Sequence, residues 1–412
     1  MKVLVLNLYY PPDTSATAKM AAAFVEPLAT NHDVTLICGR PSYDPTERRP
    51  WCLSQAEKQH NVRVVRVGST DYPRTQMARR VFNYLTYVAL SVPRALFVPC
   101  DAILAMTDPP FEGIVGAFVA MLKRKPFVYN IRDMYPDMAV GGSIVKPGWL
   151  ARIWEKLHRW ALRRATRVIV LGEDMKSRLI AKGVAPERIA IVRDGIELTT
   201  AAISVADFDP EVMNAIRGNF RFVLVHAGNL GFYGAWDALL AAARELESDG
   251  VGFIFVGDGA ERARLENAAT DSPNVRFLPF FPATKIPSVF AAADAHIITI
   301  KRGLEGVVVP SKIYGILAAG RPVVAFAPKE TDAAALAARE GFGIAADPDS
   351  PSELVTVLRA LFADPVRLVA MGAAARTAAQ QYNRANEIQK FAAILNDVAV
   401  GVQHAVPHVR QL

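Results

Sequence analysis

The chain opens with MKVLVLNLYYPP, residues 1–12, and this stretch decides what kind of fold follows. Val3–Leu6 is a continuous apolar run, which predicts a strand buried on both faces of a parallel sheet. The turn after it, Asn7–Pro12, lacks the G-x-G-x-x-G pattern that holds a dinucleotide pyrophosphate against the next helix. We therefore expect an α/β protein that is not a dinucleotide-dependent oxidoreductase.

Apolar runs of this kind alternate with helical segments along the chain, in two series. Continuous apolar strands separated by helices indicate parallel sheets covered on both faces. The expected fold is therefore α/β, with two Rossmann-like doubly wound parallel-sheet domains whose strand ends face a cleft. The expected strands are residues 3–6, 34–38, 62–67, 102–106, 127–131, 168–171 and 189–192 in the first series, and 222–226, 252–256, 275–278, 296–300, 323–326 and 343–346 in the second.

The length of 412 residues agrees with this division, because it is too great for one ordinary hydrophobic core. A more polar stretch from Asp194 to about Phe220 separates the two series. The expected parts are an N-terminal domain at 1–196, a linker at 197–219, a C-terminal domain at 220–378, a C-terminal helix able to pack back on the N-terminal domain at 379–400, and a tail at 401–412.

Charge is distributed unevenly between the two halves. Residues 1–200 contain 28 Lys and Arg against 18 Asp and Glu, a net +10, and the rest contains 19 against 22, a net −3, which together give +7. A basic half suggests an anionic partner, either a membrane surface or a nucleic acid, although simple solubility explains it equally well. No nucleic-acid-binding module is recognisable, so we expect no nucleic-acid partner.

The start of the chain and its cysteines bear on localisation. No basic start followed by an apolar stretch and a small-residue cleavage site is present. Cys38, Cys52 and Cys100 are odd in number and lack metal-ligand spacing, so we interpret them as reduced thiols. We expect a cytoplasmic protein.

The segment VVVPSKIYGILAAGRPVV, residues 307–324, carries the clearest functional signal. Pro310 suits the first position of a helix, and Gly320 followed by Pro322 ends that helix before a strand. Lys312 then lies in the first turn, where the helix dipole disfavours a cation by about 0.3–1 kcal/mol. A bound diphosphate would reverse this penalty. The alternative is a solvated lysine at a frayed helix start.

Two glycine-containing turns follow strands of the same half, His226–Gly231 and Gly257–Gly259. Glycine allows the backbone to approach a ligand closely. Each turn alone is also explained as a tight connection without a ligand. Together with the Lys312 segment, they favour a ligand site in the C-terminal domain.

In order and spacing, these pieces resemble glycosyltransferase family 4 of the GT-B fold, especially its bacterial surface-polysaccharide branch. The resemblance runs almost end to end. It implies a metal-independent enzyme without a cofactor that transfers a hexose-type sugar from a nucleotide sugar, a UDP-sugar above all, with retention of the anomeric configuration. The segments that carry it are residues 7–12, 38–43, 131–136, 166–172, 191–197, 225–231, 255–259 and 309–324.

The resemblance also implies which residues bind each substrate. The C-terminal domain would hold the donor, and the N-terminal domain would hold a lipid-linked or saccharide acceptor. The implied donor residues are Gly228, Asn229, Gly257, Phe280, Phe281, Glu305, Pro310, Ser311 and Lys312. The implied acceptor residues are Tyr9, Thr14, Ser15, Thr17, Arg132, Asp133 and Tyr135.

Two of these residues are the candidates for catalysis. Lys312 would stabilise the charge that develops on the leaving diphosphate. Asp133, at a strand end, would orient or deprotonate the acceptor hydroxyl, a step in which the resemblance also implies help from the leaving phosphate. The alternative for Asp133 is an ion pair with Arg132 or another neighbour, or a helix cap.

The donor site departs from the family pattern in its acidic residues. Family members often carry two glutamates eight residues apart, whereas the corresponding positions here are Val307 and Gly315. Glu305 is the nearest acid, ten residues before Gly315, so its donor role rests on inference.

Two further departures concern basic residues and a histidine. Basic residues commonly follow the glycine-rich turn, but residues 232–234 are Phe-Tyr-Gly. This shifts the expected phosphate binding toward Lys312, with Lys301 or Arg302 as helpers. The histidine typical of the N-terminal domain has no clear equivalent here.

No metal site is expected. Residues 207–209 and 347–349 both fit the D-x-D pattern of metal-dependent transferases, but the first falls in the linker and the second in a Pro turn. His404 and His408 are the histidines at ligand spacing, and they lie in the expected tail, where chance explains them better.

Residues 149–164 have the pattern of an amphipathic helix, with Arg152, Lys156, Arg159 and Arg163 on one face. Such a helix can lie on an anionic bilayer, and the alternative is a helix packed on its own sheet with a solvated basic face. A second apolar stretch, residues 77–98, is interrupted by polar residues and does not cross a membrane. We expect peripheral contact with the inner face of the cytoplasmic membrane.

Two rival functions remain open at this point. One is a nucleotide-sugar epimerase on the same scaffold, which would convert the donor without any acceptor. The other is a catalytically silent subunit that binds a sugar nucleotide, which would bind UDP without turnover.

Overall fold

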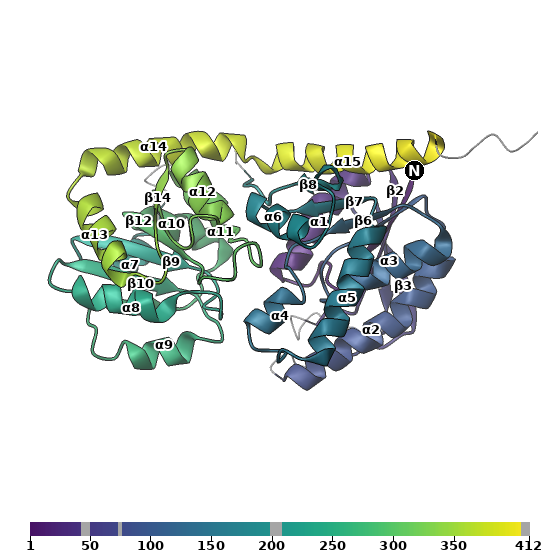
Figure 1. Ribbon diagram of the computed structural model, residues 1–412, viewed down its shortest axis with the longest axis horizontal. Helices are drawn as coiled ribbons and strands as arrows, with labels where there is room; N and C mark the ends of the chain where they lie inside the picture. The colour runs from purple at the N-terminus through teal and green to yellow at the C-terminus, as the bar shows by residue number, and fades with distance from the viewer. Residues whose placement is uncertain (43–49, 73–75, 198–207, 405–412) are drawn as a thin grey trace, which may run out of the picture.

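The structure is a computed structural model that describes residues 1–42, 50–72, 76–197 and 208–404. Two lobes lie side by side, and each is built on one sheet (Figure 1). The sheet of the N-terminal half has the order β3 (Ser54–Gln59), β4 (Val62–Val67), β2 (Asp33–Cys38), β1 (Lys2–Leu6), β5 (Ala102–Ala105), β6 (Phe127–Asn130), β7 (Arg167–Val170) and β8 (Ile189–Ile191). The sheet of the C-terminal half has the order β11 (Val275–Leu278), β10 (Val251–Val256), β9 (Phe222–Ala227), β12 (Ala295–Thr299), β13 (Val323–Phe326) and β14 (Gly343–Ala346).

Helices cover both sheets, as the alternating pattern predicts. The helices of the N-terminal half are α1 (Ala16–Leu28), α2 (Met77–Phe97), α3 (Glu112–Lys123), α4 (Asp137–Gly141), α5 (Trp149–Arg164), α6 (Glu173–Ala181) and the 3-10 turn η2 (Pro186–Arg188). The later ones are α7 (Pro210–Arg217), α8 (Trp236–Glu245), α9 (Arg262–Ala268), η4 (Ala283–Lys285), α10 (Ile286–Ala292), α11 (Lys312–Ala318), α12 (Asp332–Arg339), α13 (Pro351–Phe362), α14 (Pro365–Gln381) and α15 (Arg384–His404).

The expected fold class is confirmed. Each expected strand is present with both ends within one residue of its apolar run. Among the described strands, every neighbouring pair is parallel except β3 and β4, which are antiparallel. Strand β3 was not expected, because its residues SQAEKQ are mostly exposed at the sheet edge and form no apolar run.

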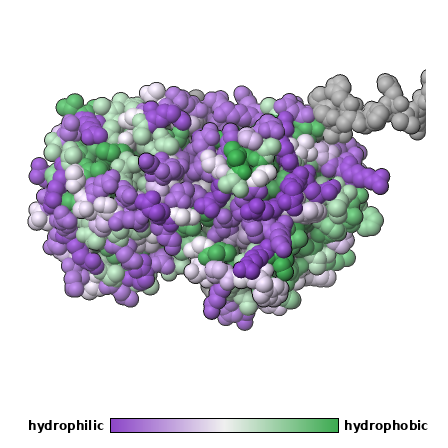
Figure 2. Space-filling view, viewed as in Figure 1, coloured by the Kyte–Doolittle hydropathy of each residue, from purple (hydrophilic) through white to green (hydrophobic). Residues whose placement is uncertain are grey.

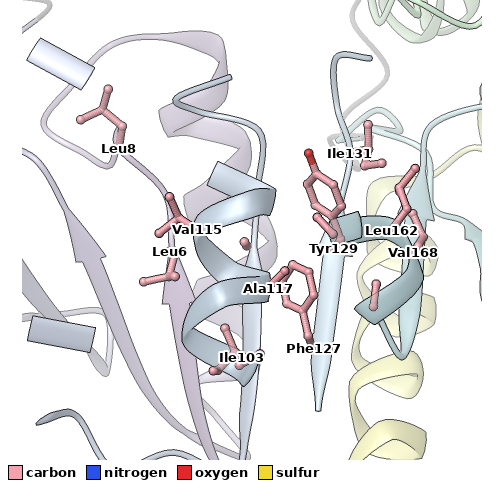
Figure 3. Packing of buried hydrophobic residues seen from close by; sticks show 14 of the residues in the cluster. Leu6, Leu8, Ile103, Val115, Ala117, Phe127, Tyr129, Ile131, Leu162 and Val168 are labelled. Atoms are coloured by element: carbon pink, nitrogen blue, oxygen red, sulfur yellow. The ribbon is translucent and has the colours of Figure 1, made fainter. Parts of the chain in front are cut away.

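The core of the N-terminal half lies between its sheet and the helices on it. Val115 and Ala117 of α3 face Leu6, Ile103 and Phe127 of the sheet (Figure 3). This packing holds the sheet rigidly, so the loops at the carboxyl ends of its strands start from set positions.

The stretch expected as a linker contains a helix of the C-terminal half. Helix α7 begins after Asp209, whose carboxylate accepts hydrogen bonds from the amides of Glu211 and Val212 at 2.9 and 3.1 Å. Val212 and Ile216 are buried in one cluster with residues of β9 and α10. The expected linker, residues 197–219, therefore extends too far, because α7 within it belongs to the C-terminal half. Its residues 198–207 lie outside the described parts of the chain.

The last helix returns to the N-terminal half. Helix α14 packs on α11 in the C-terminal half, and α15 then runs across the N-terminal lobe (Figure 1). Phe391 is buried there against Phe24 of α1, with ring centroids 5.1 Å apart. The expected boundary at residue 378 falls inside α14, and α15 continues to His404, within the expected tail. His408 lies outside the described residues.

Candidate active site

Strands β9 and β10 of the C-terminal half end side by side in two glycine turns. The Gly228 amide donates to the carbonyl oxygen of Val256 at 2.8 Å. Gly228 and Gly257 have φ angles of +139° and +142°, and a Cβ on Gly257 would collide with the carbonyl oxygen of Gly228. These glycines therefore form one close-packed backbone surface at the carboxyl ends of neighbouring strands, where parallel sheets bind ligands.

Lys312 is brought over this surface from the start of α11. Its Nζ lies 2.9 Å from Nε2 and 3.0 Å from Nδ1 of His226, and 3.7 Å from the position that a Cβ on Gly228 would take. Burial lowers the pKa of Lys312 to about 7, and no acidic group in the described chain opposes this shift. Burial and the nearby ammonium lower the pKa of His226 well below its usual range. The imidazole is therefore neutral and can accept a hydrogen bond from the ammonium.

The local structure around Lys312 differs from the expectation in one respect. Pro310 does not occupy the first position of the helix, because α11 begins at Lys312 with the exposed Ser311 as its N-cap. The Pro310 carbonyl accepts a hydrogen bond from the Ile313 amide at 3.2 Å, so proline precedes the first helical turn. Lys312 still lies in that first turn.

Trp236 supports this part of the site and was not a predicted residue. Its ring stands edge-on to His226, with centroids 4.9 Å apart and an interplanar angle of 84°. Its Nε1 donates to the carbonyl oxygen of Gly231 at 2.6 Å. Trp236 therefore holds both the imidazole and the glycine turn, and no spacing rule in the sequence marks it for this role.

The remaining donor candidates separate in space. The ring of Phe280 is 58% exposed and its edge lies 3.2 Å from the Cβ position of Gly257, at the rim of the glycine surface. Phe281 packs into the hydrophobic cluster of α7 and α10. Glu305 accepts a hydrogen bond from the Gly303 amide at 2.9 Å, so its carboxylate closes its own loop.

Arg302 pairs with both aspartates of the second D-x-D pattern. Arg302 forms ion pairs with Asp347 at 2.7 Å and Asp349 at 2.6 Å. This pairing directs Arg302 away from a helper role in phosphate binding. Within the described ranges, no cluster of His, Cys, Asp and Glu has the geometry of a metal site, and Asp207 lies outside them.

Asp133 follows β6 at the carboxyl edge of the N-terminal sheet. Burial and the neighbouring carboxylate of Asp108 raise the pKa of Asp133 to about 6, although Arg132 opposes the shift. Arg132 forms its ion pair with Asp194, which follows β8, rather than with Asp133. The side chain of Tyr135 stacks on Trp154 of α5, with centroids 5.8 Å apart and an interplanar angle of 12°.

The acceptor candidates near the start of α1 have different environments. Ser15 is the N-cap of α1, and its hydroxyl accepts a hydrogen bond from the Ala18 amide at 3.0 Å. Tyr9 is buried in the core of the N-terminal half. Thr14 is exposed and Thr17 half-buried. Ser15 and Tyr9 thus have structural roles that the sequence analysis did not anticipate.

The two halves meet next to Asp133. The Met134 amide donates to the carbonyl oxygen of Val307 at 3.1 Å. The Tyr233 hydroxyl donates to the carbonyl oxygen of Asn229, and the nearby Asp133 carboxylate adds to burial in raising the pKa of Tyr233 to about 12. Tyr233, noted in the sequence only as a departure from the family, therefore bonds to the glycine turn of one half and is close enough to the carboxylate of the other to feel its charge.

Comparisons with known families assign both halves of the chain. A glycosyl transferase 4-like domain matches residues 15–195, and a domain of the glycosyl transferases group 1 matches residues 221–364. The chain is a glycosyltransferase of family 4 with the GT-B fold.

One curated relative spans nearly the whole enzyme, and another spans about seven tenths of it. The enzyme is 26% identical to the putative colanic acid biosynthesis glycosyl transferase WcaI of Escherichia coli, over 97% of this chain and all of the relative. It is 23% identical to the probable glycosyltransferase WbjE of Pseudomonas aeruginosa, over 71% of this chain and 74% of that protein.

Solved structures share the fold of this glycosyltransferase. Anabaena HepE in complex with UDP and glucose superposes with a TM-score of 0.69 at 21% identity, covering 96% of this chain and all of that one. WaaG, a glycosyltransferase involved in lipopolysaccharide biosynthesis, has a TM-score of 0.62 at 17% identity, covering 96% and 99% of the two chains. At this level of identity, the likeness supports the GT-B architecture alone.

Proposed function

We propose that this glycosyltransferase transfers a hexose from a UDP-sugar to a lipid-linked or saccharide acceptor in bacterial surface-polysaccharide synthesis. The observation that carries the proposal is Lys312, a half-buried cation beside two glycine turns with no acidic partner in the described chain. The names of two similar proteins support it, since WcaI is named a putative colanic acid biosynthesis glycosyl transferase and HepE was solved in complex with UDP-glucose.

A diphosphate at this position would supply the negatively charged partner that Lys312 lacks. It would return the pKa of the ammonium toward its ordinary value, and the backbone surface at Gly228 and Gly257 would admit its oxygens closely. As the bond between the anomeric carbon and the diphosphate oxygen breaks, negative charge builds on the leaving group. Lys312 would then contribute more in the transition state than in the ground state.

The acceptor would react from the side of Asp133. A new bond forms between the acceptor oxygen and the anomeric carbon, and the hydroxyl proton passes to Asp133 or to an oxygen of the leaving diphosphate. Neither route needs a metal ion, and retention of configuration is part of the proposal through the family resemblance.

The test is an assay with radiolabelled nucleotide sugars and membrane extract, carried out with and without excess chelator. We expect label from a UDP-sugar to enter the lipid or saccharide fraction equally in both conditions. Conversion of the donor without extract would indicate an epimerase, and UDP binding without any transfer would indicate a silent subunit. Loss of transfer in chelator that Mn²⁺ or Mg²⁺ restores would contradict metal independence.

We also propose that the N-terminal half lies on an anionic membrane at the cytoplasmic face. Helices α2, α3 and α5 lie next to one another, and hydrophobic surface borders hydrophilic surface on this lobe (Figure 2). No helix in the described parts of the chain is long and apolar enough to span a bilayer. The exposed apolar side chains on these three helices include Val81, Phe82, Leu85, Phe118, Leu122, Trp149, Leu150, Ile153 and Leu157.

The basic face of α5 supports a lipid partner of negative charge. Arg152, Lys156, Arg159 and Arg163 are all exposed, as both interpretations of this helix require, and they would meet phospholipid headgroups if the helix lay on a membrane. The helix fully buries His158, Ala161 and Leu162 toward the protein and half-buries Trp154 and Trp160, which leaves other apolar and basic side chains together on its outer side.

Vesicle co-sedimentation tests this contact. The enzyme should bind anionic vesicles, bind neutral ones weakly, and dissociate as salt rises. Changing the four basic residues of α5 to glutamate should abolish binding. The control changes four exposed arginines of the other half in the same way and should bind normally; unaltered binding of the α5 variant would refute the proposal. The control positions are Arg264, Arg339, Arg359 and Arg367.

A further inference from the structure

The loop at residues 301–310 leads from β12 into α11 and so carries the chain to Lys312. Much of its backbone is held by the other half of the molecule. Arg178 of α6 donates from Nε to the carbonyl oxygen of Glu305 at 2.8 Å and from Nη2 to that of Gly303 at 3.1 Å. Asp137 of α4 accepts from Nη1 of the same guanidinium at 2.9 Å, which fixes its orientation.

Asp174, also on α6, holds the next part of the loop. Its Oδ2 accepts hydrogen bonds from the Gly306 amide at 3.2 Å and from the Asp332 amide at 3.0 Å, both in the C-terminal half. Gly306 has a φ of +64°, and a Cβ there would lie 2.5 Å from the carbonyl oxygen of Asp174. Only glycine allows α6 and the loop to approach this closely.

The contact is reciprocal at the two helix starts. While Asp174 accepts the Asp332 amide at the start of α12, Asp332 accepts the Glu173 amide at the start of α6, at 3.0 Å. Arg193 neutralises Asp332 with two hydrogen bonds of 2.6 and 3.0 Å. Each helix therefore supplies a carboxylate for the free amides of the other, across the boundary between the halves.

We propose that α6 of the N-terminal half positions the donor loop for the C-terminal half, with Asp174 and Arg178 as positioning residues for nucleotide-sugar binding at Lys312. This role of α6 rests on the donor site proposed above and explains what holds the loop before Lys312 in its position. Neither residue contacts Lys312, and both act on it through the loop backbone.

The physical reason is the small number of bonds that the loop makes by itself. Within the loop, the amides of Leu304 and Val307 donate at 3.3 and 3.1 Å, and the Gly303 amide donates to Glu305. Its first two residues are held within the C-terminal half, where the Lys301 amide donates to the carbonyl oxygen of Tyr233 at 2.8 Å and Arg302 pairs with Asp347 and Asp349. The restraints on residues 303–307 from the other half come from Arg178, Asp174 and the Met134 amide. If the halves separate, these restraints are lost together, so donor binding and closure of the halves must favour each other.

Calorimetric titration with UDP and steady-state kinetics test this coupling. Asp174→Asn turns an amide group toward two N–H donors, and Arg178→Ala removes both carbonyl contacts. Each should weaken UDP binding about 5-fold or more and raise the donor KM, with kcat changed less than about twofold. Arg178→Lys should recover only part of the affinity, because an ammonium cannot reproduce the guanidinium fork. Glu173→Gln is the matched control on the same helix and should behave as the wild type.

Hydrogen exchange of residues 301–310 separates this inference from the proposed function. Exchange there should accelerate in Asp174→Asn and Arg178→Ala but not in Glu173→Gln. If the wild type bound no UDP, the donor site would be wrong, while unaltered exchange in both variants would overturn the role of α6. Wild-type UDP affinity in both variants, or an equal loss in Glu173→Gln, would overturn the inference and leave the donor site standing. Arg178→Ala keeps the test decisive if Asp174→Asn does not fold.

Discussion

Replacing Lys312 by alanine should weaken UDP binding and remove most of its pH dependence between about pH 7 and 9. The ammonium would donate a charge-assisted hydrogen bond to the diphosphate, which contributes about 1.5–3 kcal/mol, or roughly a 10- to 150-fold change in affinity. The loss in kcat/KM should be at least as large, because charge on the leaving diphosphate grows in the transition state.

The pH dependence follows from the lowered pKa of Lys312, about 7 in the free protein. A diphosphate raises that pKa, so binding takes up a proton wherever the free lysine is neutral. The contribution of the ammonium to affinity is therefore complete only well below pH 7 and is lost as the pH rises through 7. The ammonium fraction falls from about one half at pH 7 to about one tenth at pH 8 and about one hundredth at pH 9. UDP binding should therefore weaken about fivefold between pH 7 and pH 8, and about a further tenfold between pH 8 and pH 9.

The assay is calorimetric titration of UDP at pH 7, 8 and 9 for the wild type, Lys312→Ala and a control, Lys285→Ala. Lys285 is partly exposed on the same half and pairs with Asp209, so its removal should change neither affinity nor pH profile. If Lys312→Ala binds UDP as the wild type does, or keeps the same loss of affinity with pH, the ammonium does not bind the diphosphate.

Three other substitutions test separate parts of the structure. Asp133→Asn should lower turnover while UDP affinity stays near normal. It should also remove a rise in kcat/KM near pH 6, since the pKa of about 6 makes Asp133 a carboxylate only above that pH. A pH–rate profile like that of the wild type would count against this role. Gly257→Ala should lower both Tm and UDP affinity, because its Cβ would collide with the Gly228 carbonyl at a φ of +142°, and an unchanged melting curve would contradict the close packing. Arg193→Met should reduce the free energy of unfolding by about 3–5 kcal/mol, because it leaves the buried carboxylate of Asp332 without its cation; denaturant titration should detect this, and a change below about 1 kcal/mol would be inconsistent.

The fold could be predicted because parallel strands buried on both faces must be apolar throughout. The runs that become β1 and β9 stand out on that ground alone. The polar edge strand β3 does not, because its exposed residues are free to be hydrophilic. Helix α7 has a recognisable start at Asp209 and Pro210, but the polar residues around it favour a linker over a helix.

The candidate site was predictable in its backbone and less so in its side chains. Gly228 and Lys312 were expected in one ligand site of the C-terminal domain, and in the structure the Lys312 Nζ lies 3.7 Å from the position that a Cβ on Gly228 would take. The partner of Lys312 was not foreseen, since His226 belongs to a strand 86 residues earlier. Phe280 and Phe281 are neighbours in sequence, yet only the first is exposed at the rim.

The sequence by itself determined the two sheets, the glycine turns and the position of a lysine at the start of a helix, because these depend on local periodicity and on glycine's backbone freedom. Only the tertiary structure decided how the charges are used. It placed the half-buried Lys312 beside His226, paired Arg132 with Asp194, and set α6 against the donor loop. Burial and pairing arise between residues far apart in the chain, so no local pattern records them.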